Sequence, residues 1–134
     1  MGTPKPIPQE LQAHILPFDW DVCKVWFLPT LPEQIKRSEL DYLLDLKLWS
    51  SIPNAGMLFD ISPRSVIESP AASPHQYQRI QQADTSFPID MLSFRNRRWI
   101  LDGVHRLAKL CIIDSEWVAL RLHSETLIAA IRTN

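Results

Sequence analysis

The change of hydrophobic period at Asp102-Gly103 is the feature that most constrains how this chain folds. Before it, apolar residues run over 89–94 and, after a polar break at Arg95-Asn96-Arg97, over 99–101. This pattern predicts a β-hairpin with a three-residue loop. After it, the apolar residues have the i, i+3, i+4, i+7 spacing of one helical stripe: Val104, Leu107, Ala108 and Cys111. The sequence therefore predicts that a strand gives way to a helix at Gly103.

This junction has the elements of an anion site. The first amides of a helix have no intrahelical partner and lie at the positive end of the helix dipole, and a glycine there lets a ligand approach the backbone. Arg106 adds a fork of donors that suits phosphate oxygens, and Asp102 adds a carboxylate for a metal ion or a hydroxyl proton. The alternative is an ordinary helix start in which Asp102 is a cap.

The sequence around this junction resembles a known family. The run Asp102-Gly103-Val104-His105-Arg106-Leu107-Ala108-Lys109 is similar to the central motif of the ParB/sulfiredoxin superfamily, a Gly-x-His/Arg-Arg turn between a strand and a helix. The similarity covers roughly Leu40 to Leu122 and is strongest to short, free-standing ParB-like domains. Its other parts are residues 43–46, 62–63, 79–84 and 118–121.

The resemblance implies a nucleotide site at the turn. In that superfamily sulfiredoxins use ATP, partition proteins use CTP, and ParB-like free-serine kinases use a nucleotide phosphate donor. We therefore expect ATP, ADP or CTP, with Mg²⁺ held at Asp102 and phosphate held by the residues of the turn: Gly103, Val104, His105 and Arg106. The leading hypothesis is a phosphotransferase acting on a small hydroxyl compound, with Asp102 and Glu39 as catalytic residues. Glu39 has an alternative interpretation as a charge that complements a helix dipole.

Two other functions within the superfamily can be weighed from the residues. A sulfiredoxin needs a nucleophilic cysteine in the turn, where this chain has Val104, whose side chain has no lone pair for attack. A non-catalytic nucleotide-responsive or DNA-binding module is the main alternative, because Arg95, Arg97 and Arg98 cluster at the hairpin loop. The formal net charge of −1 gives no general reason to expect a nucleic-acid or membrane partner.

The remaining pattern predicts an α+β domain with a small mixed sheet and surrounding helices, as the resemblance also implies. Strands are expected near 21–28, 57–61, 88–94, 98–102 and 117–122. Helices are expected from Ser38 through Leu48, at Pro63–Glu68, at Pro74–Ala83, from Val104, and at 125–131. Ser73 and Gln76 have the spacing of a capping box.

Length and composition favour one domain. A chain of 134 residues that is 46% hydrophobic can bury one core, which we assign to residues 20–134. Residues 1–19 are expected to be an extended N-terminal arm, because Pro4, Pro6 and Pro8 disfavour a helix or a strand.

The sequence also bears on the cellular compartment. Cys23 and Cys111 are expected to be buried, reduced thiols. The four histidines have no metal-ligand spacing, so no structural metal is expected. No apolar run approaches the length of a membrane span, and the N-terminus lacks the pattern of a signal peptide. These features predict a cytoplasmic protein.

Overall fold

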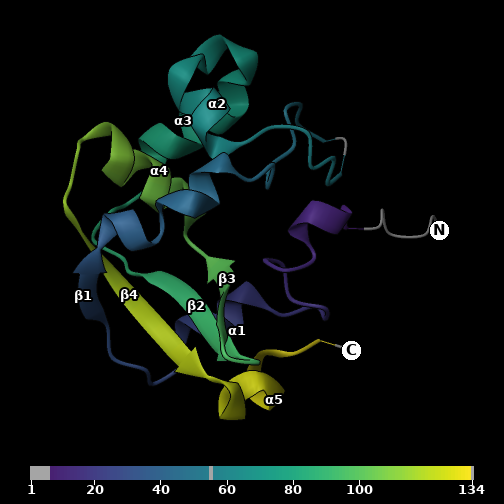
Figure 1. The fold of residues 1–134 in the computed structure, drawn as a ribbon, viewed down its shortest axis with the longest axis vertical. Coiled ribbons are helices and arrows are strands. Elements are labelled where there is room, and N and C mark those ends of the chain that lie inside the picture. The colour runs from purple at the N-terminus through teal and green to yellow at the C-terminus, as the bar shows by residue number, and fades with distance from the viewer. Residues whose placement is uncertain (1–6, 55, 134) are drawn as a thin grey trace.

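The structure, a computed structural model, describes residues 7–54 and 56–133. A four-stranded mixed sheet is surrounded by short helices, which confirms the predicted α+β class (Figure 1). The spatial order of the strands is β1-β4-β2-β3. β4 is antiparallel to β1 and parallel to β2, and β2 is antiparallel to β3. The strands are β1 (Glu33–Lys36), β2 (Ile89–Phe94), β3 (Arg97–Asp102) and β4 (Trp117–Ser124).

The helices are short and several turns are of the 3₁₀ type. Figure 1 shows α2, α3 and α4 gathered at one end of the molecule and α5 at the other. The α-helices are α1 (Val22–Trp26), α2 (Pro63–Glu68), α3 (Pro74–Gln82), α4 (Val104–Ile112) and α5 (Ile128–Ile131). The 3₁₀ turns are η1 (Gln9–Leu11), η2 (Arg37–Glu39), η3 (Asp41–Asp45), η4 (Pro70–Ala72) and η5 (Glu125–Leu127). None of the helices in the described ranges has the length and apolar character needed to cross a membrane.

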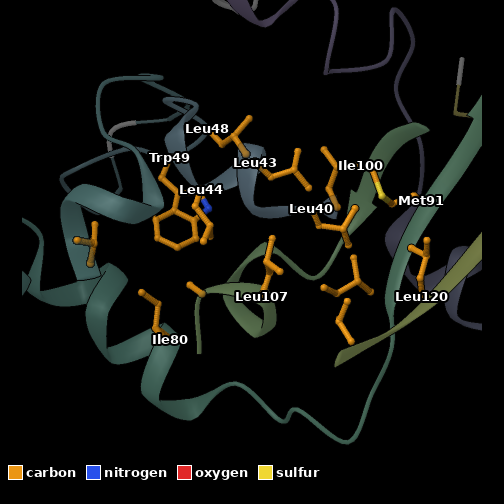
Figure 2. Close-up of a cluster of buried hydrophobic side chains, with 14 of the residues drawn as sticks. Leu40, Leu43, Leu44, Leu48, Trp49, Ile80, Met91, Ile100, Leu107 and Leu120 are labelled. Carbon is orange, nitrogen blue, oxygen red and sulfur yellow. The ribbon is translucent and has the colours of Figure 1, made fainter. Parts of the chain in front are cut away.

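The larger core covers one face of the sheet. Leu107 of α4 is fully buried and lies in the middle of this cluster (Figure 2). Side chains from η3, α2 and α3 pack around it, so α4 is held between the sheet and the other helices. The larger core includes Leu40, Leu43, Leu44, Val66, Ile80, Ile89, Met91, Ile100, Leu107, Val118 and Leu120.

A smaller core covers the opposite face. It joins the segment around α1 to the C-terminal α5, and both pack on side chains of β2 and β3 that alternate with those of the larger core. Its buried members are Leu16, Val25, Leu28, Leu92, Trp99, Leu101 and Ile131. The sheet is therefore buried on both faces, which is the usual environment of a parallel strand pair such as β2 and β4.

The predicted hairpin forms, but its turn is tighter than expected. Phe94 pairs with Arg97, which leaves only Arg95 and Asn96 between the strands. Their φ angles are 52° and 59°, both in the left-handed region, as in a type I′ turn. The three-residue loop was therefore wrong by one residue, because a type I′ turn matches the twist of the flanking strands.

Two of the expected strands are wrong. Residues 21–28 contain the helix α1, which begins where Asp21 accepts a hydrogen bond from the Cys23 amide at 2.9 Å. Val25 and Leu28, three residues apart, are the buried positions of this segment, which is a helical spacing. Residues 57–61 contribute only an isolated bridge between Trp49 and Ile61. Phe59 has a φ of 50°, which interrupts an extended strand there.

Other expectations need smaller corrections. The helix expected from Ser38 through Leu48 is replaced by η2 and η3, although its apolar stripe is buried as predicted. Residues 1–6 of the expected arm lie outside the described residues, and the rest of it packs on the core, with Leu11 and Leu16 buried. Cys23 is exposed and Cys111 is partly buried, so the expected burial of both thiols was wrong.

The position of Leu107 gives a test of this packing. Leu107→Ala removes a fully buried side chain from the centre of the larger core, so we expect a loss of about 2–5 kcal/mol in the free energy of unfolding. Urea denaturation measures this loss. Ile112→Ala, at an exposed position of the same helix, is the control and should change stability by about 0.5 kcal/mol or less. Equal losses in both variants would contradict the described core.

Candidate functional site

The strand–helix junction has the backbone geometry that was predicted. Gly103 has a φ of 112° and is the N-cap residue of α4. The first backbone bond of the helix runs from the Leu107 amide to the Gly103 carbonyl at 3.0 Å. Within residues 7–54 and 56–133, the amides of Val104, His105 and Arg106 have no hydrogen-bond acceptor. Three donors therefore remain available at the positive end of α4.

The guanidinium of Arg106 lies directly over Gly103. A Cβ atom built on Gly103 would be 2.9 Å from Arg106 Nη2 and 3.2 Å from the Cα of Ile89. Arg106 Nη2 donates a hydrogen bond to Asp102 Oδ2 at 3.1 Å. Arg106 Nε is buried and has no acceptor among the described residues. The glycine is thus needed both for its positive φ and for the close approach of this side chain.

Asp102 is held by two donors. Besides Arg106, Trp26 at the end of α1 donates from Nε1 to Asp102 Oδ2 at 2.9 Å. The neighbouring Leu101 carbonyl accepts from Trp20 Nε1 at 3.1 Å. Asp102 is therefore an ion-pair and hydrogen-bond partner of the junction, while the cap of α4 is Gly103.

A polar cavity of about 260 Å³ opens beside the junction. It is lined by Gly103 and His105 and by two arginines and two carboxylates: Arg79, Arg106, Asp84 and Asp102. Lys109 donates to the carbonyls of Gln81 and Ala83, both at 2.8 Å, and so fixes the end of α3 beside α4. Asp84 was not predicted as a site residue. The signal for it was its place at the end of segment 79–84, which is part of the resemblance.

The side chain of His105 is turned towards Trp49 and the helix α3. Its ring stacks on Trp49, with centroids 4.1 Å apart and planes 9° apart. Gln76 Nε2 donates to the Ser50 carbonyl, so Gln76 Oε1 must accept the 2.7 Å bond from His105 Nε2. Burial, followed by Arg79, His75 and Arg106, lowers the pKa of His105 to about 3. The imidazole is therefore neutral at physiological pH, with its proton on Nε2.

This arrangement replaces the predicted capping box. Gln76 is turned towards His105 and the Ser50 carbonyl, and Ser73 Oγ donates to the Ser51 carbonyl at 2.7 Å. Ser73 makes no side-chain cap of α3. The two polar side chains thus join α3 to the loop before α2.

Glu39 lies away from the junction. Its Oε1 accepts a hydrogen bond from Arg98 Nη1 at 3.2 Å. Arg98 is near the start of β3 and Asp102 is at its end, and four residues of strand span about 13 Å. The structure therefore brings Gly103, Val104, His105, Arg106 and Asp102 together but does not bring Glu39 to them.

The arginines of the hairpin are engaged with nearby side chains. The guanidinium of Arg95 lies 4.7 Å from the ring centroid of Phe94, and that of Arg97 lies 5.5 Å from the ring of Trp99. With Arg98 bound to Glu39, all three have partners on their own chain. Arg95 and Arg97 remain exposed at the tip of the hairpin.

A larger cavity of about 530 Å³ lies on the other side of Arg106. Its walls are mostly apolar and include Trp26 and Phe87, and its polar side chains are Thr30, Asp90, Arg106 and Arg121. Arg121 lies in β4, between β1 and β2, and its Nε donates to the buried Asp90 at 2.7 Å.

The donor sets bear on metal binding. In the part of the chain that the structure describes, no group of three or more His, Cys, Asp or Glu side chains could hold a metal ion. Mg²⁺ bound together with a nucleotide needs only one or two protein carboxylates, because phosphate oxygens and water complete its coordination. Asp84 and Asp102 both line the polar cavity, where Asp84 Oδ1 accepts from the amide and hydroxyl of Ser86 and Asp102 Oδ2 accepts from Trp26 and Arg106.

Comparisons with known proteins found no match, so the function has to be inferred from the site itself. No protein-family model matches the chain, and neither the curated proteins nor the solved structures contain a match.

Gly103→Ala tests the contact between the glycine and Arg106. The new methyl group would require both a positive φ and a displacement of the guanidinium. Gly56→Ala is the matched control, since Gly56 has a φ of 74° with nothing within 4 Å of the new Cβ. We expect the control to lose about 1–2 kcal/mol of stability and Gly103→Ala to lose about 1–3 kcal/mol more. Chemical denaturation distinguishes these, and equal losses would contradict the close approach.

The lowered pKa of His105 predicts a pH dependence of stability. The unfolded chain takes up a proton near the ordinary pKa of 6.5, whereas the folded chain does so only near 3, so stability is full above 6.5 and falls as the pH drops towards 3. His105→Phe keeps a ring on Trp49 without the titration. Between pH 6.5 and 4 the wild type should lose at least about 1.4 kcal/mol more than this variant. Parallel stability curves would contradict the neutral imidazole.

Proposed function

We propose that the strand–helix junction binds the phosphate groups of a nucleoside di- or triphosphate, as in the ParB/sulfiredoxin superfamily that the sequence resembles. The observation that carries this proposal is the position of the Arg106 guanidinium and its incomplete hydrogen bonding. Its guanidinium lies over a positive-φ glycine, beside three amides without acceptors, and its Nε is buried without an acceptor. Donors that converge in this way suit an anion with several oxygens.

The energetics favour a ligand at this place. A buried donor without a partner costs about 1–3 kcal/mol. Arg106 has five N–H groups, and one of them donates to the Asp102 carboxylate. A small displacement of the guanidinium would expose Nε, and a phosphate oxygen would then satisfy it. The same phosphate would accept from the free amides of Val104 and His105.

The charged side chains of the polar cavity also suit the phosphates of a nucleotide that is bound with Mg²⁺. The two carboxylates among them, Asp84 and Asp102, would hold the ion, and Arg79 and Arg106 would face the phosphates. When bound, Mg²⁺ neutralises charge on the phosphate oxygens during phosphoryl transfer. The polar cavity has room for phosphates, and the rest of the nucleotide would occupy an adjoining apolar cavity of about 260 Å³ that shares Asp102, Gly103 and His105.

A phosphotransferase acting on a small hydroxyl compound is the narrower form of this proposal. The carboxylates that line the polar cavity would orient an acceptor hydroxyl or take its proton. Asp102 keeps this expected role, and Asp84 takes the second position in place of Glu39, whose partner is Arg98. The residues beside the phosphate site thus define the candidates for chemistry.

Ligand-dependent stability tests the proposal. The melting temperature is measured with ATP, ADP and CTP, each with Mg²⁺. A nucleotide at about 100 times its dissociation constant should add about 2.7 kcal/mol to the stability of the protein. Arg106→Lys keeps the charge but loses the fork, so calorimetry should show binding weakened by about 1–3 kcal/mol.

The control for this experiment is Arg64→Lys. Arg64 of α2 pairs with Asp45 of η3, outside the cavity, so its replacement should leave nucleotide affinity unchanged. Two results would count against the site. One is the absence of stabilisation by every nucleotide at millimolar concentration, and the other is an Arg106→Lys protein that is folded and binds as tightly as the wild type.

A further inference from the structure

A chain of hydrogen bonds at the wall of the larger cavity has the composition of a hydroxyl–imidazole–carboxylate triad. Thr30 Oγ1 is 2.7 Å from His123 Nδ1, and His123 Nε2 is 2.8 Å from Asp90 Oδ1. His123 is fully buried and Asp90 is 2% exposed. Thr30 is partly exposed and lines the cavity, so the hydroxyl end of the chain is the accessible one.

The partners determine the direction of each hydrogen bond. Asp90 Oδ1 also accepts from Arg121 Nε at 2.7 Å, and a guanidinium can only donate. An ionised carboxylate only accepts, so His123 Nε2 must carry the proton. In the neutral imidazole Nδ1 then has a lone pair and accepts from the Thr30 hydroxyl. This is the arrangement in which a base removes the proton of a nucleophilic hydroxyl.

The cavity suits an uncharged, apolar acyl group. Its wall is largely apolar, with Trp26, Pro32, Phe87 and Pro88 beside Thr30, and its volume is about 530 Å³. Arg121 also lines it and uses three of its five N–H groups on Asp90 and on the carbonyls of Val25 and Leu28. The other two N–H groups are donors for an oxygen that becomes negatively charged.

From this geometry we propose that Thr30 is a nucleophile for acyl transfer from carboxylic esters with a small apolar acyl group. Thr30 Oγ1 forms a bond to the ester carbonyl carbon and its proton passes to His123 Nδ1. The bond between that carbon and the alcohol oxygen breaks, and the alcohol leaves with the proton from His123. Water then attacks the acyl carbon and gives a proton to the same nitrogen; the bond from that carbon to Thr30 Oγ1 breaks, Thr30 regains the proton from His123, and the carboxylic acid is released. Asp90 positions His123 and holds its tautomer.

The test uses p-nitrophenyl butyrate and a protein carrying Cys23→Ser, because the exposed Cys23 thiol could itself attack an activated ester. We expect release of nitrophenolate and, after acid quenching, a butyryl group on the peptide that contains Thr30. Thr30→Val should lower the rate at least about 100-fold. Thr30→Ser keeps the hydroxyl and should still be acylated.

Thr126→Val is the matched control, since Thr126 is exposed and lies outside the cavity wall. It should react like the parent, and the melting temperatures of all variants show whether they are folded. If the Thr30 hydroxyl only anchors its loop, no acyl group will be found on Thr30. The proposal is overturned if the parent protein carries no butyryl group on Thr30, or if folded Thr30→Val releases nitrophenolate as fast as Thr126→Val. Nucleotide binding at the junction is not involved in either result.

Discussion

The pairing of the buried Asp90 with Arg121 is the interaction on which the rest of this structure depends. Asp90 and Arg121 are direct partners in the parallel pair of β2 and β4. Removing one member of a buried charge pair typically costs about 3–5 kcal/mol, because the other charge is left without compensation. A register slip of one residue would turn Arg121 into the larger core. The ion pair therefore selects the register of the central strands as well as the face that carries the polar cluster.

The same pair fixes the N-terminal segment. Arg121 donates to the carbonyls of Val25 and Leu28, at and just beyond the end of α1, both at 2.9 Å. The Leu28 carbonyl lies beyond the helix end, and the Val25 carbonyl also accepts from the Leu28 amide at 3.1 Å, so the guanidinium adds a donor to both while it neutralises Asp90. α1 is thereby held on the sheet, and Trp26 at its end reaches Asp102. The position of Asp102, and through it that of Arg106, thus depends on contacts made at the other side of the larger cavity.

This dependence explains which parts could be predicted from the sequence. The hairpin, α4 and the α2 and α3 helices have local signals in apolar spacing, glycine or proline, so they were found to within a residue or two. α1 was misassigned because alternating and helical spacing cannot be told apart over so few residues, and its stability comes from the distant Arg121. The contacts of Asp90, His123 and Thr30 join residues far apart in sequence, so no spacing signals them.

The two arginines of the larger cavity differ in how much of their hydrogen-bonding capacity the fold uses. Arg121 has three acceptors of its own and is 12% exposed, so most of its capacity is structural. Arg106 has one acceptor among the described residues, Asp102, and the two side chains are 17% and 26% exposed. Releasing Arg106 would leave Asp102 with its hydrogen bond from Trp26, whereas displacing Arg121 would unpair the buried Asp90 and free α1. A ligand that needs a guanidinium fork is thus expected at Arg106, where the chain can give up a contact without losing its fold.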